Sequence, residues 1–170
     1  EVPVNPTPLV CFAPNPYSGN YYRLFMKALG SDRTMLALDY PGIGQSDTYP
    51  GELDMGTLAE IMADSLTSLG WGPEGAGPVD LCGYHTGTML ATELAITHPE
   101  LVRRIILMGI PYYDAAGRQE RLDRLARVKP WPDSFAAVAQ DWIFAVEMRN
   151  EKVSLERAFG NYLESAGAWQ

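Results

Sequence analysis

The sequence predicts an α/β fold, in which a mainly parallel sheet carries helices on both faces. Two observations predict it. Short apolar runs alternate with segments of helical periodicity along the first two-thirds of the 170 residues, and each run is closed by a proline or a glycine. Strands that alternate with helices at this spacing are joined by right-handed crossovers, which make the strands parallel.

Four elements are expected in the first half of this pattern. In chain order they are a strand at residues 9–13, a helix at 21–29, a strand at 34–39 and a helix at 57–69. Pro14 closes the first strand, and Gly30 ends the first helix because glycine readily takes the backbone conformation found there. The second helix keeps its apolar side chains on one face, and Thr57 and Glu60 have the spacing of a capping box.

Three more elements complete the pattern before Pro111, and only helices follow it. The expected elements are a strand at 79–82, a helix at 88–97 and a strand at 102–108, then helices at 118–128, 134–149 and 154–166. We therefore divide the chain into a partial α/β core, residues 1–111, and a helical cap or lid region, residues 112–170. Nine of the 18 aromatic residues follow Pro111. They form either the underside of a lid or the apolar faces of packed helices.

Composition and charge exclude several classes of protein. The 13 basic and 21 acidic residues give a net charge of −8, whereas nucleic acids and anionic membranes are bound by basic patches. Two cysteines are too few for a disulfide framework or a typical structural zinc site. No apolar run approaches the roughly 18 residues of a membrane span. We expect a cytoplasmic protein that binds a small molecule and uses no metal or cofactor, with homo-oligomer formation left open.

The segment after the third expected strand carries the strongest chemical signal. The strand runs through Gly83, Tyr84, His85, Thr86 and Gly87 into a helix, which is the context of a nucleophile elbow. The side chain at the centre of such a turn projects over the end of the sheet, and the small flanking residues let strand and helix pack closely. Free backbone N–H groups at the helix N-terminus favour negative charge and can form an oxyanion hole.

In four places the chain resembles the α/β-hydrolase family. Residues 8–16 are similar to the family's third strand and oxyanion loop, and residues 39–47, DYPGIGQSD, to its D-x-P-G-x-G-x-S-D loop. Residues 83–87 resemble its elbow, and residues 98–104 its turn into the sixth strand. Because the four motifs stand in the family's order and at its spacing, the resemblance covers residues 8–111. The rest of the chain fits a cap insertion by position only.

The sequence departs from the family at the reacting position. His85 stands where the family carries Ser, or Asp in epoxide hydrolases and haloalkane dehalogenases. An imidazole there could be a general base for water, a nucleophile that forms an acyl-imidazole, or a ligand-binding group. Pro14 has no N–H to donate. The resemblance therefore implies the backbone N–H groups of Asn15 and Thr86 as the oxyanion hole.

The resemblance also implies elements that this chain does not contain. The family's fold begins with an N-terminal antiparallel hairpin and ends with C-terminal strands that supply a catalytic acid and a late His. We therefore expect the chain to be a fragment of a larger protein. Six residues are interpreted as structural or solvated, the last two as buried, reduced thiols: Asp39, Asp47, Asp114, His98, Cys11 and Cys82.

The leading hypothesis is a hydrolase of a small, apolar ester or related acyl compound, with His85 at the reacting centre. Five aromatic side chains are expected to contact the substrate: Tyr84, Tyr112, Tyr113, Trp131 and Trp142. One alternative is a hydrolase-like protein that binds a ligand without turnover. Another is a lyase or a cofactor-free oxygenase on the same fold, because a fold alone does not define a reaction.

Overall fold

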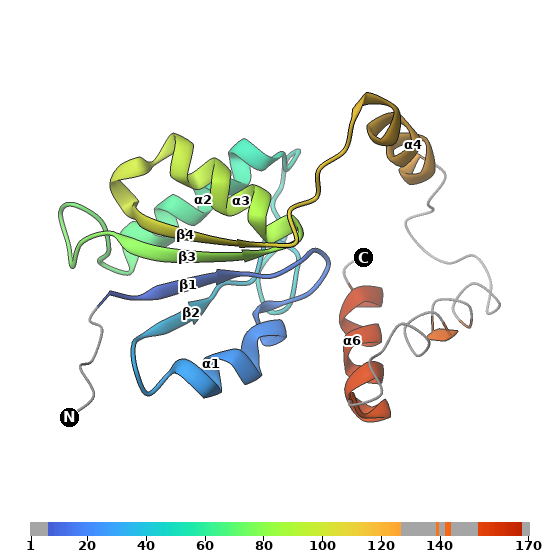
Figure 1. Cartoon of the computed structure of the whole chain (residues 1–170), viewed down its shortest axis with the longest axis horizontal. Helices are drawn as coiled ribbons and strands as arrows, with labels where there is room; N and C mark the ends of the chain where they lie inside the picture. The colour runs from blue at the N-terminus through green and yellow to red at the C-terminus, as the bar shows by residue number, and fades with distance from the viewer. Residues whose placement is uncertain (1–6, 127–138, 140–141, 144–152, 168–170) are drawn as a thin grey trace. The chain divides into compact units, whose positions relative to one another are not determined.

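The computed structural model describes residues 7–126, 139, 142–143 and 153–167 of the chain. The chain divides into two compact units, Glu1–Pro111 and Tyr112–Gln170. The first unit contains the sheet and the helices that cover it (Figure 1). The second unit is helical in its described residues.

Four parallel strands form the sheet of the first unit. They are β1 (Leu9–Phe12), β2 (Met35–Ala37), β3 (Val79–Tyr84) and β4 (Val102–Met108), in the spatial order β2-β1-β3-β4. β1 pairs with β2 on one side and with β3 on the other, and this register places Cys11 beside Cys82. The sheet confirms the α/β class and the parallel arrangement predicted from the sequence.

Helices lie on both faces of this sheet (Figure 1). The short η1 (Gly19–Tyr22) and α1 (Arg23–Leu29) lie on one face, and α2 (Met55–Ser68) and α3 (Thr86–Thr97) lie on the other. The single turn η2 (Pro99–Leu101) leads from α3 into β4. Every connection between successive strands therefore contains a helix, as parallel strands require.

The helix α2 begins earlier than its sequence pattern indicates. The Asp54 carboxylate accepts the backbone N–H of Thr57 at 2.7 Å, so Asp54 is the N-cap and the helix starts at Met55. The predicted capping box of Thr57 and Glu60 is wrong, because Thr57 already lies inside the first turn. The hydrogen bond from Thr57 also lowers the pKa of the Asp54 carboxyl.

The connection from β3 to α3 is tighter than expected. The strand runs to Tyr84 and the helix begins at Thr86, whereas the sequence predicted a strand to residue 82 and a helix from residue 88. Only His85 lies between the two elements. The backbone of this one residue therefore takes the whole change of direction.

The core of the first unit contains both cysteines. Cys11 and Cys82 are free, buried thiols that pack with Leu9, Ala13 and Tyr22. The hydrogen bond with Cys82, together with burial, raises the pKa of the Cys11 thiol. The same hydrogen bond lowers the pKa of the Cys82 thiol. Both cysteines are free and buried, as the sequence predicted.

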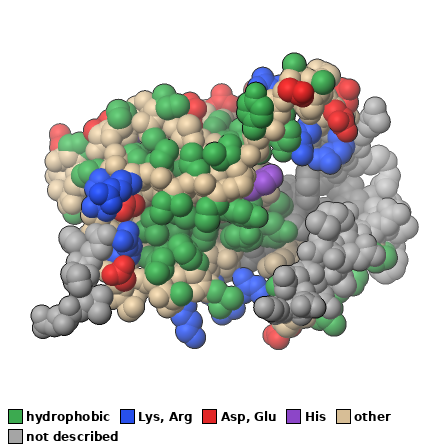
Figure 2. Space-filling view, in the orientation of Figure 1, with side chains coloured by type: hydrophobic (Ala, Val, Ile, Leu, Met, Phe, Trp, Pro, Cys, Tyr) green, Lys and Arg blue, Asp and Glu red, His purple; other side chains and the backbone are tan. Residues whose placement is uncertain are grey.

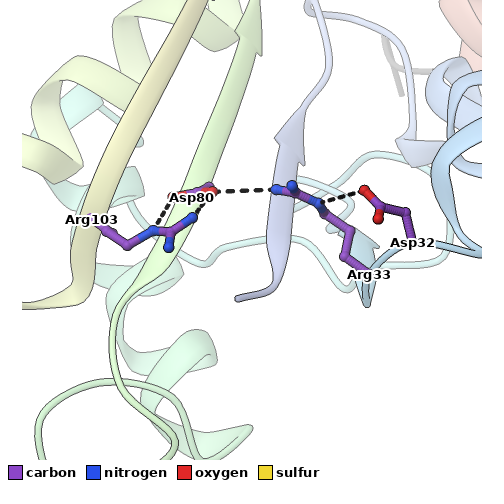
Figure 3. A network of polar contacts seen from close by, with 4 residues as sticks. All are labelled: Asp32, Arg33, Asp80 and Arg103. Carbon is purple, nitrogen blue, oxygen red and sulfur yellow. Dashed lines mark hydrogen bonds and ion pairs between the residues drawn. The ribbon is translucent and has the colours of Figure 1, made fainter. Parts of the chain in front are cut away.

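A polar network lies at the other end of β3 from His85 (Figure 3). The buried Asp80 carboxylate accepts two hydrogen bonds from Arg103, from Nε at 2.8 Å and from Nη2 at 2.7 Å. Arg33, which precedes β2, donates to the same carboxylate at 3.3 Å and also lies 3.7 Å from a carboxylate oxygen of Asp32. The Arg103 guanidinium holds the pKa of Asp80 below its usual range. The network joins β3, β4 and the segment before β2.

Hydrophobic side chains are exposed over part of the sheet unit. Figure 2 shows them gathered in one continuous area on the viewed face. On β4, Ile106 is 49% exposed and Met108 is 37% exposed. Among the described strands, β2 and β4 each have one partner and form the two edges of the sheet. The exposed apolar residues therefore extend onto an edge strand.

The second unit contains α4 (Ala115–Leu125) and α6 (Leu155–Gly167) among its described residues. α4 starts earlier than predicted because the Asp114 carboxylate accepts the backbone N–H of Gly117 at 2.8 Å and caps the helix. Asp114 is exposed at the start of the second unit, as expected, and it also caps the helix, which was not predicted. The helix predicted at 134–149 lies mostly outside the described residues.

Candidate active site

The candidate site is built on the turn between β3 and α3. His85 adopts φ 51° and ψ −115°, a conformation that L-residues rarely take. Its backbone N–H donates to the carbonyl of Met108 at 2.9 Å. Its carbonyl accepts the N–H of Thr88 at 2.9 Å and the Thr88 hydroxyl at 2.6 Å. These three bonds hold the strained backbone in place, and the residue is exposed.

Two glycines allow β3, α3 and the end of β1 to meet. A Cβ on Gly83 would collide with the carbonyl oxygen of Gly87, and a Cβ on Gly87 would collide with that of Phe12. Both obstacles are backbone atoms, which cannot move aside as a flexible side chain can. The small residues expected on either side of the turn are thus required by the packing, and β1 ends beside the N-terminus of α3.

Two buried tyrosines hold the segment that follows β1. Tyr22 donates to the carbonyl of Phe12 at 3.1 Å, and Tyr40 donates to the carbonyl of Ala13 at 2.5 Å. Burial raises the pKa of both hydroxyls, so both remain protonated donors. Sequence reasoning missed these residues because their bonds join positions 10 and 27 residues apart. The only local sign of these supporting roles in the sequence is that each tyrosine lies close to an expected strand or turn.

Asn15 and Thr86 lie on the two segments that come together here. Asn15 is exposed and precedes Pro16 through a cis peptide bond. Thr86 is the first residue of α3, where backbone N–H groups have no acceptor within the helix. The close approach of Gly87 to Phe12 brings the segment that contains Asn15 toward the start of α3.

The imidazole of His85 has a neutral neighbour. Its Nδ1 lies 3.3 Å from the Thr86 hydroxyl oxygen. In the part of the chain that the structure describes, no ion pair joins His85 to an acidic side chain. Tyr84, the residue before it, stacks on Tyr21 with ring centroids 5.7 Å apart and planes inclined by 16°. The site therefore presents a histidine with a hydroxyl partner beside an exposed aromatic pair.

Asp39 ties two loops of the first unit together. Its carboxylate accepts the backbone N–H of Gly19 at 2.7 Å and that of Gln45 at 3.1 Å. This is the structural role expected from the sequence. Asp39 also lines a groove of about 420 Å³, together with residues of η1 and α1. None of the predicted site residues lines that groove.

The second histidine joins two helices. His98 follows α3, and its Nε2 lies 3.1 Å from Glu60 on α2, while its Nδ1 lies 3.5 Å from Glu100.

The backbone carbonyl of Asp47 accepts the N–H of Gly42 at 3.0 Å and closes the loop after β2. Asp47 and His98 both have the structural surroundings expected of them.

Two of the predicted pocket residues lie where the second unit begins. The side chain of Tyr112 is 86% exposed. The Arg121 guanidinium lies over the ring of Tyr113. Its central carbon is 3.9 Å from the ring centroid, which is a cation–π distance. Trp131 lies outside the described residues.

Trp142 belongs to an aromatic cluster within the second unit. Its ring meets those of Phe159 and Tyr162 edge-on, with centroids 5.5 Å and 5.6 Å away. Edge-to-face pairs of this kind stabilise helix packing. Trp142 thus has at least one structural role, which is the alternative considered for these aromatic residues.

The described residues contain neither a metal site nor a membrane-spanning helix. No three His, Cys, Asp or Glu side chains among them are grouped closely enough to hold a metal ion. None of the helices formed by these residues combines the length and the hydrophobicity of a membrane span.

Comparison with known proteins identifies related sequences. A sequence model of the family described as alpha/beta hydrolase fold matches residues 7–154. The (E)-2-((N-methylformamido)methylene)succinate hydrolase of Acinetobacter baylyi is 27% identical over 124 residues, which cover 72% of this chain and 44% of that enzyme. Esterase FrsA of Vibrio vulnificus is 25% identical over 108 residues, covering 63% of this chain and 26% of the esterase. The chain thus spans less than half the length of these relatives.

A solved structure has the same arrangement of elements. The crystal structure of Cfl2 from Burkholderia cenocepacia matches with a TM-score of 0.73 and 20% sequence identity. The match covers 97% of this chain and 63% of that one. At this identity the likeness concerns the fold.

Proposed function

Because the chain belongs to the alpha/beta hydrolase fold family, we propose that it is a hydrolase of a small, apolar ester or related acyl compound, with His85 at the nucleophile-elbow position. The observation that carries this proposal is the backbone of His85. Its positive φ, held between β3 and α3, presents an exposed imidazole beside a helix N-terminus. Such a position favours the negative charge that develops on a reacting carbonyl.

In this proposal His85 acts as a general base. A ring nitrogen takes a proton from water while the water oxygen bonds to the acyl carbon, and the carbonyl oxygen becomes an oxyanion. When the tetrahedral intermediate collapses, the bond from the acyl carbon to the leaving oxygen breaks. The imidazolium returns its proton to that oxygen. The products are a carboxylic acid and an alcohol, and the imidazole is neutral again.

Direct attack by the imidazole is the other route open to this residue. The unprotonated ring nitrogen bonds to the acyl carbon, the bond from that carbon to the leaving oxygen breaks, and the ring N–H proton passes to that oxygen to give the alcohol. Water then hydrolyses the acyl-imidazole to the carboxylic acid and restores the neutral imidazole. The two routes differ in one observable. Only the nucleophilic route leaves the acyl group on His85, where rapid quenching and mass spectrometry would detect the added mass.

The proposed oxyanion hole uses the backbone N–H groups of Asn15 and Thr86. Two contacts support this assignment. Gly87 lies against Phe12, which brings the two segments together, and Tyr40 fixes the carbonyl of Ala13. Donors held in advance at fixed positions stabilise an oxyanion without reorganising during the reaction.

We propose the role of a cap for residues 112–170, and the aromatic residues of this unit support that role. The candidate substrate contacts are Tyr112, Tyr113, Trp131 and Trp142 in this unit and Tyr84 in the core. Pockets for small ligands are lined mainly by apolar and aromatic side chains. One curated relative is named an esterase, which supports an acyl substrate.

A specific observation also favours a second function, which is ligand binding without turnover. In many hydrolases a carboxylate orients the catalytic histidine and stabilises its protonated form. Here the ring partner within the described residues is the neutral Thr86 hydroxyl. A neutral imidazole at this position can still donate and accept hydrogen bonds to a ligand.

Ester turnover tests the proposal. The purified protein is assayed with p-nitrophenyl acetate and butyrate, and His85→Ala is expected to lose turnover while its thermal unfolding stays cooperative. The matched control is His98→Ala, because the chain has two histidines and His98 lies in a helix junction. The catalytic role is wrong if His85→Ala turns over these esters as fast as the parent. Saturable binding of acyl compounds without turnover, abolished in His85→Ala, would establish the second function instead.

A further inference from the structure

The backbone of His85 is fixed, whereas its ring can still rotate. Hydrogen bonds from its N–H to Met108 and from Thr88 to its carbonyl hold the residue on both sides. They set the direction of the Cα–Cβ bond. The two side-chain torsions and the position of the proton on the neutral ring are left to be determined by the side chain's own contacts.

The Thr86 hydroxyl is the contact that reaches the ring. Its Oγ1 lies 3.3 Å from Nδ1, and it is the hydrogen-bond partner of the imidazole within the described residues. The other threonine hydroxyls of α3 are used differently. Each donates to a backbone carbonyl one turn earlier, from Thr88 to His85, from Thr92 to Thr88 and from Thr97 to Glu93. Thr86, the first residue of the helix, has its hydroxyl beside the imidazole instead.

The hydrogen bond between Nδ1 and the Thr86 hydroxyl can run in either direction, and each direction has a different chemical consequence. If Nδ1 carries the proton, it donates to the Thr86 oxygen, and the lone pair of the neutral ring is on Nε2. If Nδ1 is unprotonated, it accepts from the Thr86 hydroxyl, and the proton is on Nε2. Nε2 is the nitrogen without a partner among the described residues, so only the first form presents an available base.

We propose that Thr86 is a positioning residue for His85: its hydroxyl oxygen accepts from Nδ1–H, limits the rotation of the ring and keeps the lone pair on Nε2. The proposal rests on the proposed function, because a base must present an unprotonated nitrogen to water or substrate. A hydroxyl carries no charge, so it orients the imidazole without stabilising the imidazolium as a carboxylate does. Thr86 therefore sets which nitrogen is basic.

Two substitutions separate the hydroxyl from the rest of the side chain. Thr86→Val keeps the branched shape and removes the hydroxyl, whereas Thr86→Ser keeps the hydroxyl. We expect kcat for ester hydrolysis to fall by about tenfold in Thr86→Val, with KM unchanged, and to be restored in Thr86→Ser. Thr97→Val is the matched control on the same helix, because its hydroxyl bonds to Glu93. Thr86→Ala serves as a second variant if valine disturbs the start of α3.

The tautomer of His85 gives a readout that does not depend on activity. Long-range ¹H–¹⁵N spectra of the protein labelled at its histidines distinguish Nδ1–H from Nε2–H, and His98→Gln assigns the two rings. We expect the Nδ1–H form of His85 in the parent, Thr86→Ser and Thr97→Val, and a mixture or the Nε2–H form in Thr86→Val.

An Nε2–H form in the parent would overturn the proposal, as would identical tautomers in the parent, Thr86→Val and Thr86→Ala. A kcat that is equal in the parent and in both hydroxyl-free variants, under conditions where His85→Ala is inactive, would also overturn it. If the parent has no esterase activity, the proposed function fails while the spectra still decide the role of Thr86. The two failures are therefore distinguishable.

Discussion

Gly87, in the first turn of α3, lies against the carbonyl oxygen of Phe12 at the end of β1, with no space between them for a side chain. We expect Gly87→Ala to lower the free energy of unfolding by about 1–3 kcal/mol, the usual cost of overpacking a core. Because this contact also sets the distance between β1 and α3, ester turnover should fall too. Urea unfolding and the p-nitrophenyl ester assay measure the two effects.

Gly160 offers the matched control for that substitution. It lies in α6, and a Cβ added there would meet no atom of the described residues within 4 Å. Gly160→Ala should raise the free energy of unfolding of its own unit by about 0.5–1 kcal/mol, because alanine loses less entropy in a helix than glycine. Opposite signs for the two substitutions are the expected result. Equal effects would contradict the packing role of Gly87.

Tyr40→Phe tests the support of the segment after β1. The change removes the donor to the Ala13 carbonyl, which stays buried, so we expect a loss of about 1–3 kcal/mol of unfolding free energy. Turnover should also fall, because Asn15 lies two residues beyond this carbonyl. Tyr49→Phe is the control, since Tyr49 is 42% exposed. If both variants unfold at the same urea concentration as the parent, the hydrogen bond from Tyr40 contributes nothing.

The ion pair of Asp80 predicts a pH-dependent stability. Arg103 lowers the folded-state pKa of the Asp80 carboxyl, so its stabilisation is fully present above the ordinary value of about 4. It is lost as the pH falls through the lower folded-state pKa. We expect Asp80→Asn to lose about 2 kcal/mol of unfolding free energy at neutral pH, because the buried carboxylate accepts charge-assisted hydrogen bonds from Arg103 and Arg33.

Chemical unfolding over a range of pH checks this prediction. The difference between the parent and Asp80→Asn should shrink as the pH falls below about 4, because the carboxyl of the unfolded chain is protonated there while the folded one is still charged, and it should vanish below the lower folded-state pKa. Asp54→Asn is a useful comparison, because Asp54 is an exposed N-cap and asparagine also caps helices well. A difference that is constant from pH 7 to pH 2 would show that the Asp80 charge does not provide the stability.

The positive φ of His85 should reduce the stability of the fold. Its φ of 51° is favourable for glycine and strained for any residue with a Cβ. We therefore expect His85→Gly to be more stable than His85→Ala by about 1 kcal/mol, although both lose turnover. Thermal unfolding of the two variants compares them directly. A His85→Ala variant as stable as His85→Gly would mean that the positive φ is not maintained in solution.

Much of the fold could be predicted because its signals are local. The expected strand at residues 102–108 coincides with β4, since an apolar run bounded by His98-Pro99 and Gly109 leaves little choice of limits. The predicted starts of two helices were wrong because a capping side chain determines where each helix begins, and apolar periodicity does not reveal the cap. Asp54 and Asp114 each cap a helix and start it before its apolar periodicity begins.

The candidate site was predicted less completely than the fold. The motif around residues 83–87 identified the turn, and its two glycines have the packing role expected of them. The supports of the site were not foreseen. Tyr22 and Tyr40 reach the end of β1 from other elements, and Met108 accepts the N–H of His85 from β4. No short-range pattern in the sequence encodes these contacts.

The sequence by itself determined the α/β class, the family and the place of His85 between a strand and a helix. Periodicity, turn residues and glycine positions act over a few neighbours, so they can be recognised before the chain is folded. Only the tertiary structure decided which groups surround these elements. Asp80 contacts Arg33 and Arg103, which lie 47 and 23 residues away in the sequence. Such pairs form only because of the order in which the strands lie side by side in the sheet. Even the Thr86 hydroxyl, adjacent to His85 in sequence, lies beside the ring in a turn whose positive φ is held in part by the hydrogen bond from the His85 N–H to Met108 on β4.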